Sequence, residues 1–221
     1  MIDTSNLNNT SQVESIEIVQ PVRDNVIFRP NPGPQTNFLA ASEREVLYGG
    51  AAGGGKSYAI LADPLRYIAH PQFSGLILRH TTEELRELIW KSQEMYPKIY
   101  PGIKWSERKM QWQHPSGGKL WMSYLDRDED VMRYQGLSFS YIAWDELTQW
   151  PTPFAYNYMR SRLRTAAPDL PVFMRATTNP GGPGHQWVRK MFIVPAAPGK
   201  SFYATDVETG ETLVYPKGHS K

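Results

Sequence analysis

The chain has 221 residues, of which 40% are apolar and 12% aromatic, and its formal net charge is +2. This composition excludes a disordered chain, which would contain fewer aromatic side chains and a more one-sided charge. The lack of cysteine excludes a disulfide scaffold and thiolate metal sites, and no apolar run is long enough to span a membrane. Residues 147–221 carry nine basic and four acidic side chains, which suits a polyanionic partner or an ordinary solvated surface equally.

In chain order, the first feature is the segment 1–27, whose content of Ser, Thr, Asn and Pro indicates a flexible tail and lead-in. A short apolar run at 46–48 predicts a strand that leads directly into glycines. Residues 57–69 then suit a helix, and residues 75–79 suit a buried strand. At this length one α/β domain is the default expectation.

The middle of the chain continues to alternate between helix and strand patterns. Thr81 and Glu84 have the spacing of a capping box, which predicts the start of a helix. Residues 110–124 predict a β-hairpin, because two alternating runs flank a turn rich in Pro, Ser and Gly. Buried strands are expected at 141–144 and at 171–176.

A further helix is predicted to begin at Thr152 and Pro153, with Thr at the N-cap and Pro at the first helical position. Strands that alternate with helices predict a mostly parallel sheet covered by helices on both faces.

The most specific motif follows the first strand. It matches G-x-x-x-x-G-K-[ST] without interruption, and it lies between a strand and a helix, as the motif requires. Glycines let backbone N–H groups point at phosphate oxygens, the lysine reaches the β- and γ-phosphates, and the hydroxyl ligates Mg²⁺. The predicted nucleotide-binding residues, including the position after the motif, are Gly50, Ala51, Ala52, Gly53, Gly54, Gly55, Lys56, Ser57 and Tyr58.

A pair of carboxylates completes the predicted site. The strand at 141–144 ends in Asp145 and Glu146, at the sheet edge where the phosphate loop is expected. Asp145 is predicted to hold Mg²⁺ together with Ser57, and Glu146 to orient and deprotonate the attacking water. We therefore expect residues 28–193 to form an α/β P-loop NTPase domain of the ASCE type, in which a catalytic Glu follows the Mg²⁺-binding Asp.

Polar residues also follow the strand at 171–176. Thr177, Thr178 and Asn179 are positioned to touch the γ-phosphate or the attacking water and to sense hydrolysis. A plain turn is the alternative, because Asn179 is followed by Pro180 and two glycines.

With these three motifs in order, the chain resembles the ATPase domain of tailed-bacteriophage terminase large subunits. The phosphate loop is shared by many NTPases, and the other matching segments are more specific. The resemblance extends from about residue 28 to residue 192. Its matching segments are 29–30 with Gln35, 76–79, 134–139 ahead of Asp145 and Glu146, and 177–182.

The resemblance implies a motor that hydrolyses ATP, with Mg²⁺ as cofactor, to drive double-stranded DNA into a preformed capsid. The implied partners are DNA, the portal protein, the terminase small subunit and further copies in a ring, usually a pentamer, with a monomer as the alternative in isolation. The implied place is the host cytoplasm, with no membrane partner. Gln35 is implied to read the adenine, and residues 177–179 to form the coupling motif.

The resemblance also implies an arginine finger. Arg133 best matches the position of this finger in the family and would act as a catalytic residue towards the ATP of a neighbouring subunit. A surface or DNA-contact role is the alternative for Arg133. The rival candidates for the finger are Arg160, Arg162 and Arg164. The strand between Arg133 and Asp145 predicts a separation on the order of 20 Å. Many family members carry an arginine inside the phosphate loop, whereas this loop has none.

Two other functions stay open. One is a different nucleic-acid-stimulated ATPase, such as a helicase or recombinase, and the other is a nucleotide-dependent assembly module that hydrolyses little ATP. Residues 194–221 are rich in Pro, Gly and Lys and are interpreted as a linker towards a nuclease domain that this chain lacks, so no nuclease activity is expected.

Overall fold

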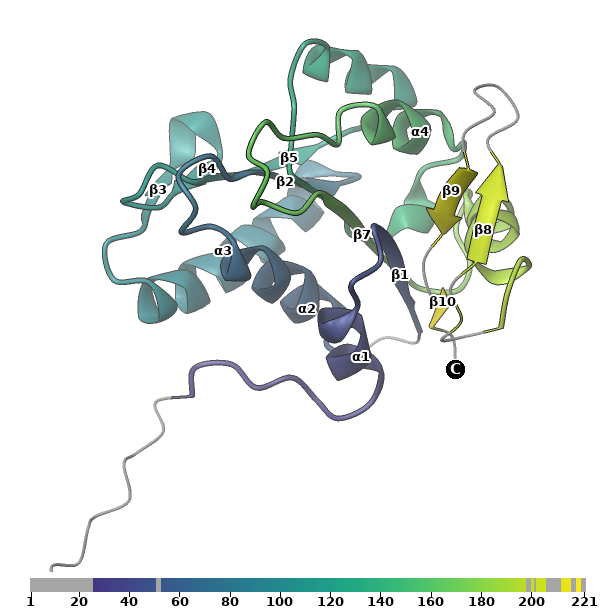
Figure 1. Ribbon diagram of the computed structural model, residues 1–221, viewed down its shortest axis with the longest axis horizontal. Helices are drawn as coiled ribbons and strands as arrows, with labels where there is room; N and C mark the ends of the chain where they lie inside the picture. The colour runs from purple at the N-terminus through teal and green to yellow at the C-terminus, as the bar shows by residue number, and fades with distance from the viewer. Residues whose placement is uncertain are drawn as a thin grey trace, which may run out of the picture.

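The computed structural model describes residues 26–50, 53–197 and 200, and the backbone of three strands nearer the C-terminus. Its main element is an eight-stranded sheet in the order β10-β1-β7-β6-β2-β5-β4-β3 (Figure 1). Neighbouring strands from β10 to β5 are parallel, and β4 and β3 add an antiparallel edge, so the predicted mostly parallel sheet is confirmed. The strands are β1 (Glu45–Gly49), β2 (Ser74–Arg79), β3 (Lys104–Ser106), β4 (Gln111–Gln113), β5 (Lys119–Tyr124), β6 (Tyr141–Trp144), β7 (Phe173–Thr178) and β10 (Gly218–His219).

Helices cover both faces of the sheet, and Figure 1 shows α2 and α3 together on one side and α4 on the other. The helices are α1 (Pro34–Ala40), α2 (Lys56–Ala62), α3 (Thr82–Ile99), α4 (Phe154–Arg160) and α5 (His185–Val188), with short helices η1 (Asp63–Arg66), η2 (Glu107–Lys109), η3 (Asp128–Tyr134), η4 (Leu147–Gln149) and η5 (Arg189–Ile193).

The alternation of side chains along each strand divides the core into two parts. Ile77 and Tyr141 pack with α2 and α3, whereas Leu76 and Trp144 pack with α4, α5 and η4. All residues of β6 and β7 are buried, as expected for central strands of a parallel sheet.

The start of α3 confirms the predicted cap in part. The Thr81 hydroxyl accepts a hydrogen bond from the Glu84 N–H at 3.3 Å. The Glu84 carboxylate instead lies 3.8 Å from the Arg79 guanidinium, so the reciprocal half of the capping box is replaced by an ion pair. The predicted hairpin is present as β4 and β5.

Two helix boundaries differ from the prediction. The helix expected over 57–69 ends at Ala62 and gives way to η1, whose Pro64 lacks the N–H that a continuing α-helix would need. The helix expected at Thr152 begins at Phe154, whose N–H donates to the Thr152 hydroxyl at 3.2 Å.

The segment 194–221 contains more structure than the predicted linker. The strands β8 (Phe202–Thr205) and β9 (Thr212–Tyr215) form an antiparallel pair, and β10 joins the main sheet beside β1. Composition did not reveal these strands, and the interpretation of 194–221 as a linker stays a prediction. No helix in the described part of the chain combines the length and the apolar character needed to cross a membrane.

Candidate functional site

The site lies where β1, β7, β6 and β2 end at the same edge of the sheet. Parallel pairing sets Gly49 opposite Thr178, and Trp144 lies opposite Ala176 on one side and Leu78 on the other. The residues that follow these strands therefore converge, which is where ligands bind in open α/β sheets.

The phosphate loop connects β1 to α2. Gly53 and Gly55 have φ values of 85° and 70°, a region that glycine adopts without steric cost. A Cβ on Gly55 would lie 2.6 Å from the amide nitrogen of the Gln35 side chain, so Gln35 would have to shift. Ala51 and Ala52 lie outside the described residues.

Lys56 begins α2 and reaches back across the loop. Its Nζ donates to the Gly50 carbonyl at 3.0 Å, and the residue is only 7% exposed. Burial lowers the pKa of Lys56, and the charges of Glu146 and Asp145 oppose this shift. The predicted phosphate-binding lysine thus shares one electrostatic environment with the predicted carboxylates.

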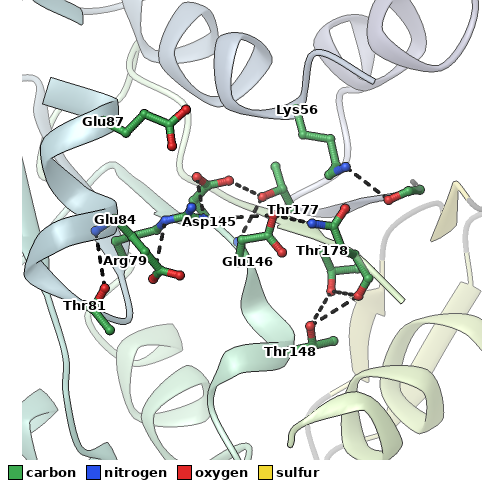
Figure 2. A network of polar contacts seen from close by, with 12 residues as sticks. Lys56, Arg79, Thr81, Glu84, Glu87, Asp145, Glu146, Thr148, Thr177 and Thr178 are labelled. Atoms are coloured by element: carbon green, nitrogen blue, oxygen red, sulfur yellow. Dashed lines mark hydrogen bonds and ion pairs between the residues drawn. The ribbon is translucent and has the colours of Figure 1, made fainter. Parts of the chain in front are cut away.

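Asp145 is buried at the end of β6. One oxygen of its carboxylate accepts a short hydrogen bond from the Thr177 hydroxyl, and the other lies 3.0 Å from the Arg79 guanidinium (Figure 2). Burial raises the pKa of Asp145, although Arg79 and the Thr177 hydrogen bond act in the opposite direction.

Glu146 has an unusual backbone conformation, with φ 61° and ψ 53°, which is costly for a residue other than glycine. Its N–H donates to the Thr177 hydroxyl at 3.1 Å, and its carboxylate accepts from the Asn179 amide at 2.7 Å. Burial raises the pKa of Glu146, and the nearby charge of Asp145 adds to this effect. Such strain and a raised pKa are typical of functional carboxylates.

The end of β7 and Asn179, which follows it, link the site to η4. The Thr178 hydroxyl donates to the Thr148 hydroxyl at 2.9 Å, and the Thr148 hydroxyl donates to the Asn179 carbonyl at 3.3 Å. Figure 2 shows these contacts beside Glu146. The polar segment 177–179 therefore contacts both predicted carboxylates and the segment that follows them.

Arg79 is a site residue to which the sequence analysis assigned no role. It ends β2 and lies 3.0 Å from Asp145 and 4.0 Å from Glu146, with only 11% of its side chain exposed. The signal was present in the sequence, because an arginine at the end of one buried strand and an aspartate directly after another meet if the strands are neighbours.

Gln35 lies beneath the phosphate loop. Its side-chain amide donates to the Gly55 carbonyl at 2.8 Å, and its oxygen accepts from the Asn31 N–H at 2.6 Å. The residue is 3% exposed. These contacts join the lead-in segment to the loop, and the role of Gln35 in reading adenine stays a prediction.

A cavity of about 380 Å³ brings the phosphate loop and the carboxylate side together. Lys91 of α3 lies over the ring of Tyr58 at 5.6 Å and pairs with Glu87 at 2.5 Å. The lining combines loop glycines with charged groups: Gly53, Gly54, Gly55, Lys56, Ser57, Tyr58, Arg79, Glu87, Lys91, Glu146 and Asn179.

Arg133 is not among the residues that line this cavity. The position of Arg133 also differs from the prediction. Its guanidinium makes a short hydrogen bond to the carbonyl of Tyr124, which lies opposite Arg79 at the end of β5. Arg133 therefore lies at the same sheet edge as Asp145 and not at the opposite end of β6. The expected separation was wrong because η3 follows the end of β5, and the chain returns to the start of β6 only after η3.

The rival arginines lie at the other edge of the sheet. Arg160 pairs with Glu45, at the start of β1, at 2.8 Å and is mostly buried. Arg164 donates to the Ser138 hydroxyl at 2.8 Å, and Arg162 lies over the ring of Tyr158 at 5.2 Å. Arg160 thus has a structural partner far from its own phosphate loop.

The donor set fits Mg²⁺. This ion is usually bound by one or two carboxylates together with phosphate oxygens and water. Asp145 offers a buried carboxylate oxygen that accepts no hydrogen bond from the described residues and lies 3.0 Å from the Arg79 guanidinium. Ser57 offers a hydroxyl in the first turn of α2, on the wall of the same cavity.

Comparison with solved structures supports the fold. The ATPase domain of the large terminase of Thermus phage P74-26 is similar at 14% identity and a TM-score of 0.56, with 88% of this chain and 79% of that chain covered. A large terminase from a second thermophilic bacteriophage is similar at 14% identity and a TM-score of 0.55, with 73% and 42% covered. For the HK97 bacteriophage large terminase the identity is 15%, the TM-score 0.51, and the coverage 68% and 33%.

This chain therefore spans less than half the length of the second and third of these terminases. No curated protein matches it. The likeness to solved structures confirms the P-loop NTPase fold. The model of the family described as terminase large subunit, T4likevirus-type, N-terminal, matches residues 47–187. The chain belongs to this family and corresponds to the N-terminal region of the terminase large subunit.

Proposed function

We propose that this chain is an ATP-hydrolysing motor domain that drives double-stranded DNA into a viral procapsid. One observation carries the proposal: a phosphate loop, a strained Glu and a polar strand end line or border a single cavity. The DNA, the portal, the small subunit, the ring of copies and the host cytoplasm enter as what the family implies.

In this proposal the loop N–H groups and Lys56 hold the phosphates of ATP. Asp145 and Ser57 would hold Mg²⁺, which supplies positive charge that offsets the charge of the phosphate oxygens. The N-terminus of α2 adds a favourable field for an anion.

Glu146 acts as the general base towards a water molecule. Support comes from its place on the cavity wall and from its hydrogen bond to Asn179, which fixes the direction of the carboxylate. Its raised pKa suits a base, because a carboxylate with a higher proton affinity removes a proton from water more readily.

Positive charge for the transition state has two proposed sources besides Lys56. Arg79 is in the same chain, on the wall of the cavity beside Glu146. The second is Arg133 of a neighbouring copy, as the family resemblance implies. An arginine that meets the transferring phosphoryl group typically contributes about 10³–10⁵-fold in rate.

The release of phosphate is proposed to reach the rest of the domain through the end of β7. Thr178 and Asn179 contact Thr148, and the Thr148 carbonyl accepts from the Gly184 N–H at 2.8 Å, directly before α5. A change at Glu146 therefore has a continuous set of hydrogen bonds towards α5.

The proposal is tested by comparing Lys56→Ala and Glu146→Gln for nucleotide binding and phosphate release, with folding checked by circular dichroism. We expect Lys56→Ala to lose both. Glu146→Gln should bind Mg²⁺-ATP and lose about 10²–10⁴-fold in turnover, because an amide accepts no proton. Folded variants that hydrolyse ATP at the wild-type rate would refute the assignment.

Coupling to DNA requires its own measurement. The wild-type chain, assembled on procapsids with its partners, is expected to protect DNA from nuclease in an ATP-dependent manner, and Glu146→Gln should abolish the protection. Hydrolysis without any DNA protection would separate an ATPase from a packaging motor.

A further inference from the structure

Arg79 lies among three carboxylates at the end of β2 (Figure 2). Its Nη1 lies 3.0 Å from the Asp145 carboxylate and 4.0 Å from that of Glu146, and its Nε lies 3.8 Å from that of Glu84. Asp145 and Glu146 follow β6, whereas Glu84 belongs to the first turn of α3. One arginine therefore connects the predicted carboxylate pair to the start of a neighbouring helix.

The contact between Arg79 and Asp145 is close but poorly directed. The Nε and Nη1 atoms of Arg79 are buried, and neither has a hydrogen-bond partner among the described residues. The Asp145 oxygen that lies 3.0 Å from Nη1 also accepts no hydrogen bond from them. Charge therefore holds this pair together without the aligned N–H···O bonds that make arginine–carboxylate pairs strong. Arg79 loses few directed bonds if it moves to another anionic oxygen.

Glu84 provides such an oxygen. The Glu84 oxygen nearest to Arg79 is buried and has no hydrogen-bond partner among the described residues. Arg79 can thus turn towards Glu84 or Glu146 without crossing the site, because both carboxylates lie within 4.0 Å.

The Asp145 oxygen that faces Arg79 is also the oxygen that suits Mg²⁺. A cation bound at this oxygen would meet the positive charge of Arg79, and like charges repel each other more strongly in a buried site than in water. Two cations therefore have a claim on one carboxylate oxygen.

We propose that Arg79 competes with the divalent cation for the Asp145 carboxylate, so that Arg79 leaves Asp145 when the cation is bound. The inference rests on the proposed function for the assignment of Asp145 to the metal. Arg79 lines the same cavity as Lys56, so the nucleotide phosphates are a further anionic partner for the displaced guanidinium. The phosphate loop itself contains no arginine. The competition makes the arginine of this chain available to phosphate only after the metal site is filled.

The test measures metal binding and not turnover. Mn²⁺ prefers the same oxygen ligands as Mg²⁺, and its binding in the presence of ADP is followed by electron paramagnetic resonance at pH 8. Arg79→Met removes the competing charge, so Mn²⁺ should bind at least about tenfold more tightly than to the wild-type chain. Arg79→Lys keeps the charge and should stay closer to wild type. A role of Arg79 in packing alone predicts the opposite, because a loosened site binds the metal more weakly.

A second comparison does not need Arg79→Met to fold. Glu84→Gln removes an alternative acceptor for Arg79, which should then hold Asp145 more firmly and weaken Mn²⁺ binding. Glu87→Gln is the matched control: it removes the same charge from the same helix, but Glu87 pairs with Lys91 and lines the cavity itself. A general field effect would therefore be at least as large for Glu87→Gln, whereas the competition predicts a larger loss for Glu84→Gln.

Two further variants separate the inference from the proposed function. Asp145→Asn should weaken Mn²⁺ binding, and Arg86→Met, which removes an exposed charge from α3, should leave it within about twofold of wild type. Circular dichroism establishes that each variant is folded.

The competition is overturned if folded Arg79→Met binds Mn²⁺ no more tightly than wild type, or if Glu84→Gln weakens binding no more than Glu87→Gln does. With Asp145→Asn still impaired, either result leaves the proposed metal site intact. Unchanged Mn²⁺ binding by Asp145→Asn would instead refute the metal site in the proposed function, and the competition with it.

Discussion

The side-chain amide of Asn179 donates to the Glu146 carboxylate at 2.7 Å, so the end of β7 holds the residue proposed as the base. Glu146 also donates its N–H to Thr177, and its backbone lies in the left-handed region. Strain of this kind persists only where surrounding contacts enforce it. The segment 177–179 thus positions Glu146 and is able to respond when its carboxylate changes partner.

Asn179→Asp tests this relationship through the pH profile. Glu146 must be ionised to act, so activity is present above its pKa and is lost as pH falls through it. The wild-type acidic limb of kcat/KM should lie above the ordinary value for Glu, about 4.3, because burial and Asp145 raise the pKa. A second negative charge at position 179 should move the limb to still higher pH.

Asn179→Ala is the control, because it removes the hydrogen bond without adding charge. Asn179→Ala should lower kcat and should shift the acidic limb of the kcat/KM profile less than Asn179→Asp does. Coincident pH profiles for the two variants would contradict a direct contact between position 179 and Glu146.

Arg79→Met should destabilise the protein without nucleotide or Mg²⁺. Removing one member of a buried ion pair typically costs about 3–5 kcal/mol, and here the Asp145 carboxylate would lose its ion-pair partner. The pKa of Asp145 in the folded state should rise further. The folded state is penalised while Asp145 is ionised, so the loss should be largest at neutral pH and should shrink as pH falls through the raised pKa.

Urea denaturation at several pH values measures this effect. The double variant Arg79→Met with Asp145→Asn should recover much of the lost free energy of unfolding, because the buried charge of Asp145 is removed together with its partner. Equal destabilisation of the single variant at all pH values would show that packing, and not charge, explains its cost.

The buried pair of Arg175 and Asp63 joins β7 to the end of α2. Their atoms lie 3.1 Å apart, and Arg175 also donates to the carbonyls of Ala41 and Glu43 at 2.9 Å. Asp63 also pairs with Arg66, so Arg175→Met should lower the free energy of unfolding by at most about 3–5 kcal/mol. Arg189→Met, at an exposed position, is the matched control and should change it by no more than about 0.5 kcal/mol.

Arg133→Ala should bind ATP normally and hydrolyse it about 10³–10⁵-fold more slowly in the assembled state. Mixed with Glu146→Gln, it should regain activity, because an Arg133→Ala subunit keeps its base and receives the arginine of its neighbour. A mixture with no more activity than the sum of its components, under conditions where assemblies form, would exclude Arg133 as a finger in trans.

Local sequence determined much of the site. The spacing of glycines, Lys56 and Ser57 predicts the phosphate loop, and apolar runs predict β1, β2 and β6, because these signals depend only on neighbouring residues. The start of α3 at Thr81 was also predicted from neighbouring residues. The carboxylates were assigned correctly to a strand end because Asp145 and Glu146 follow an apolar run directly.

Only the tertiary structure decided which strand ends meet. Arg79 contacts Asp145 because β2 lies beside β6, and local sequence does not specify strand order. Arg133 returns to the same sheet edge because η3 packs beside β5, and β10 joins β1 by parallel pairing. The contacts of Arg79 with Asp145 and of β1 with β10 join residues far apart in the chain, whereas Arg133 and Tyr124 are nine residues apart. All three depend on the order of strands in the sheet, which exists only when the sheet has formed.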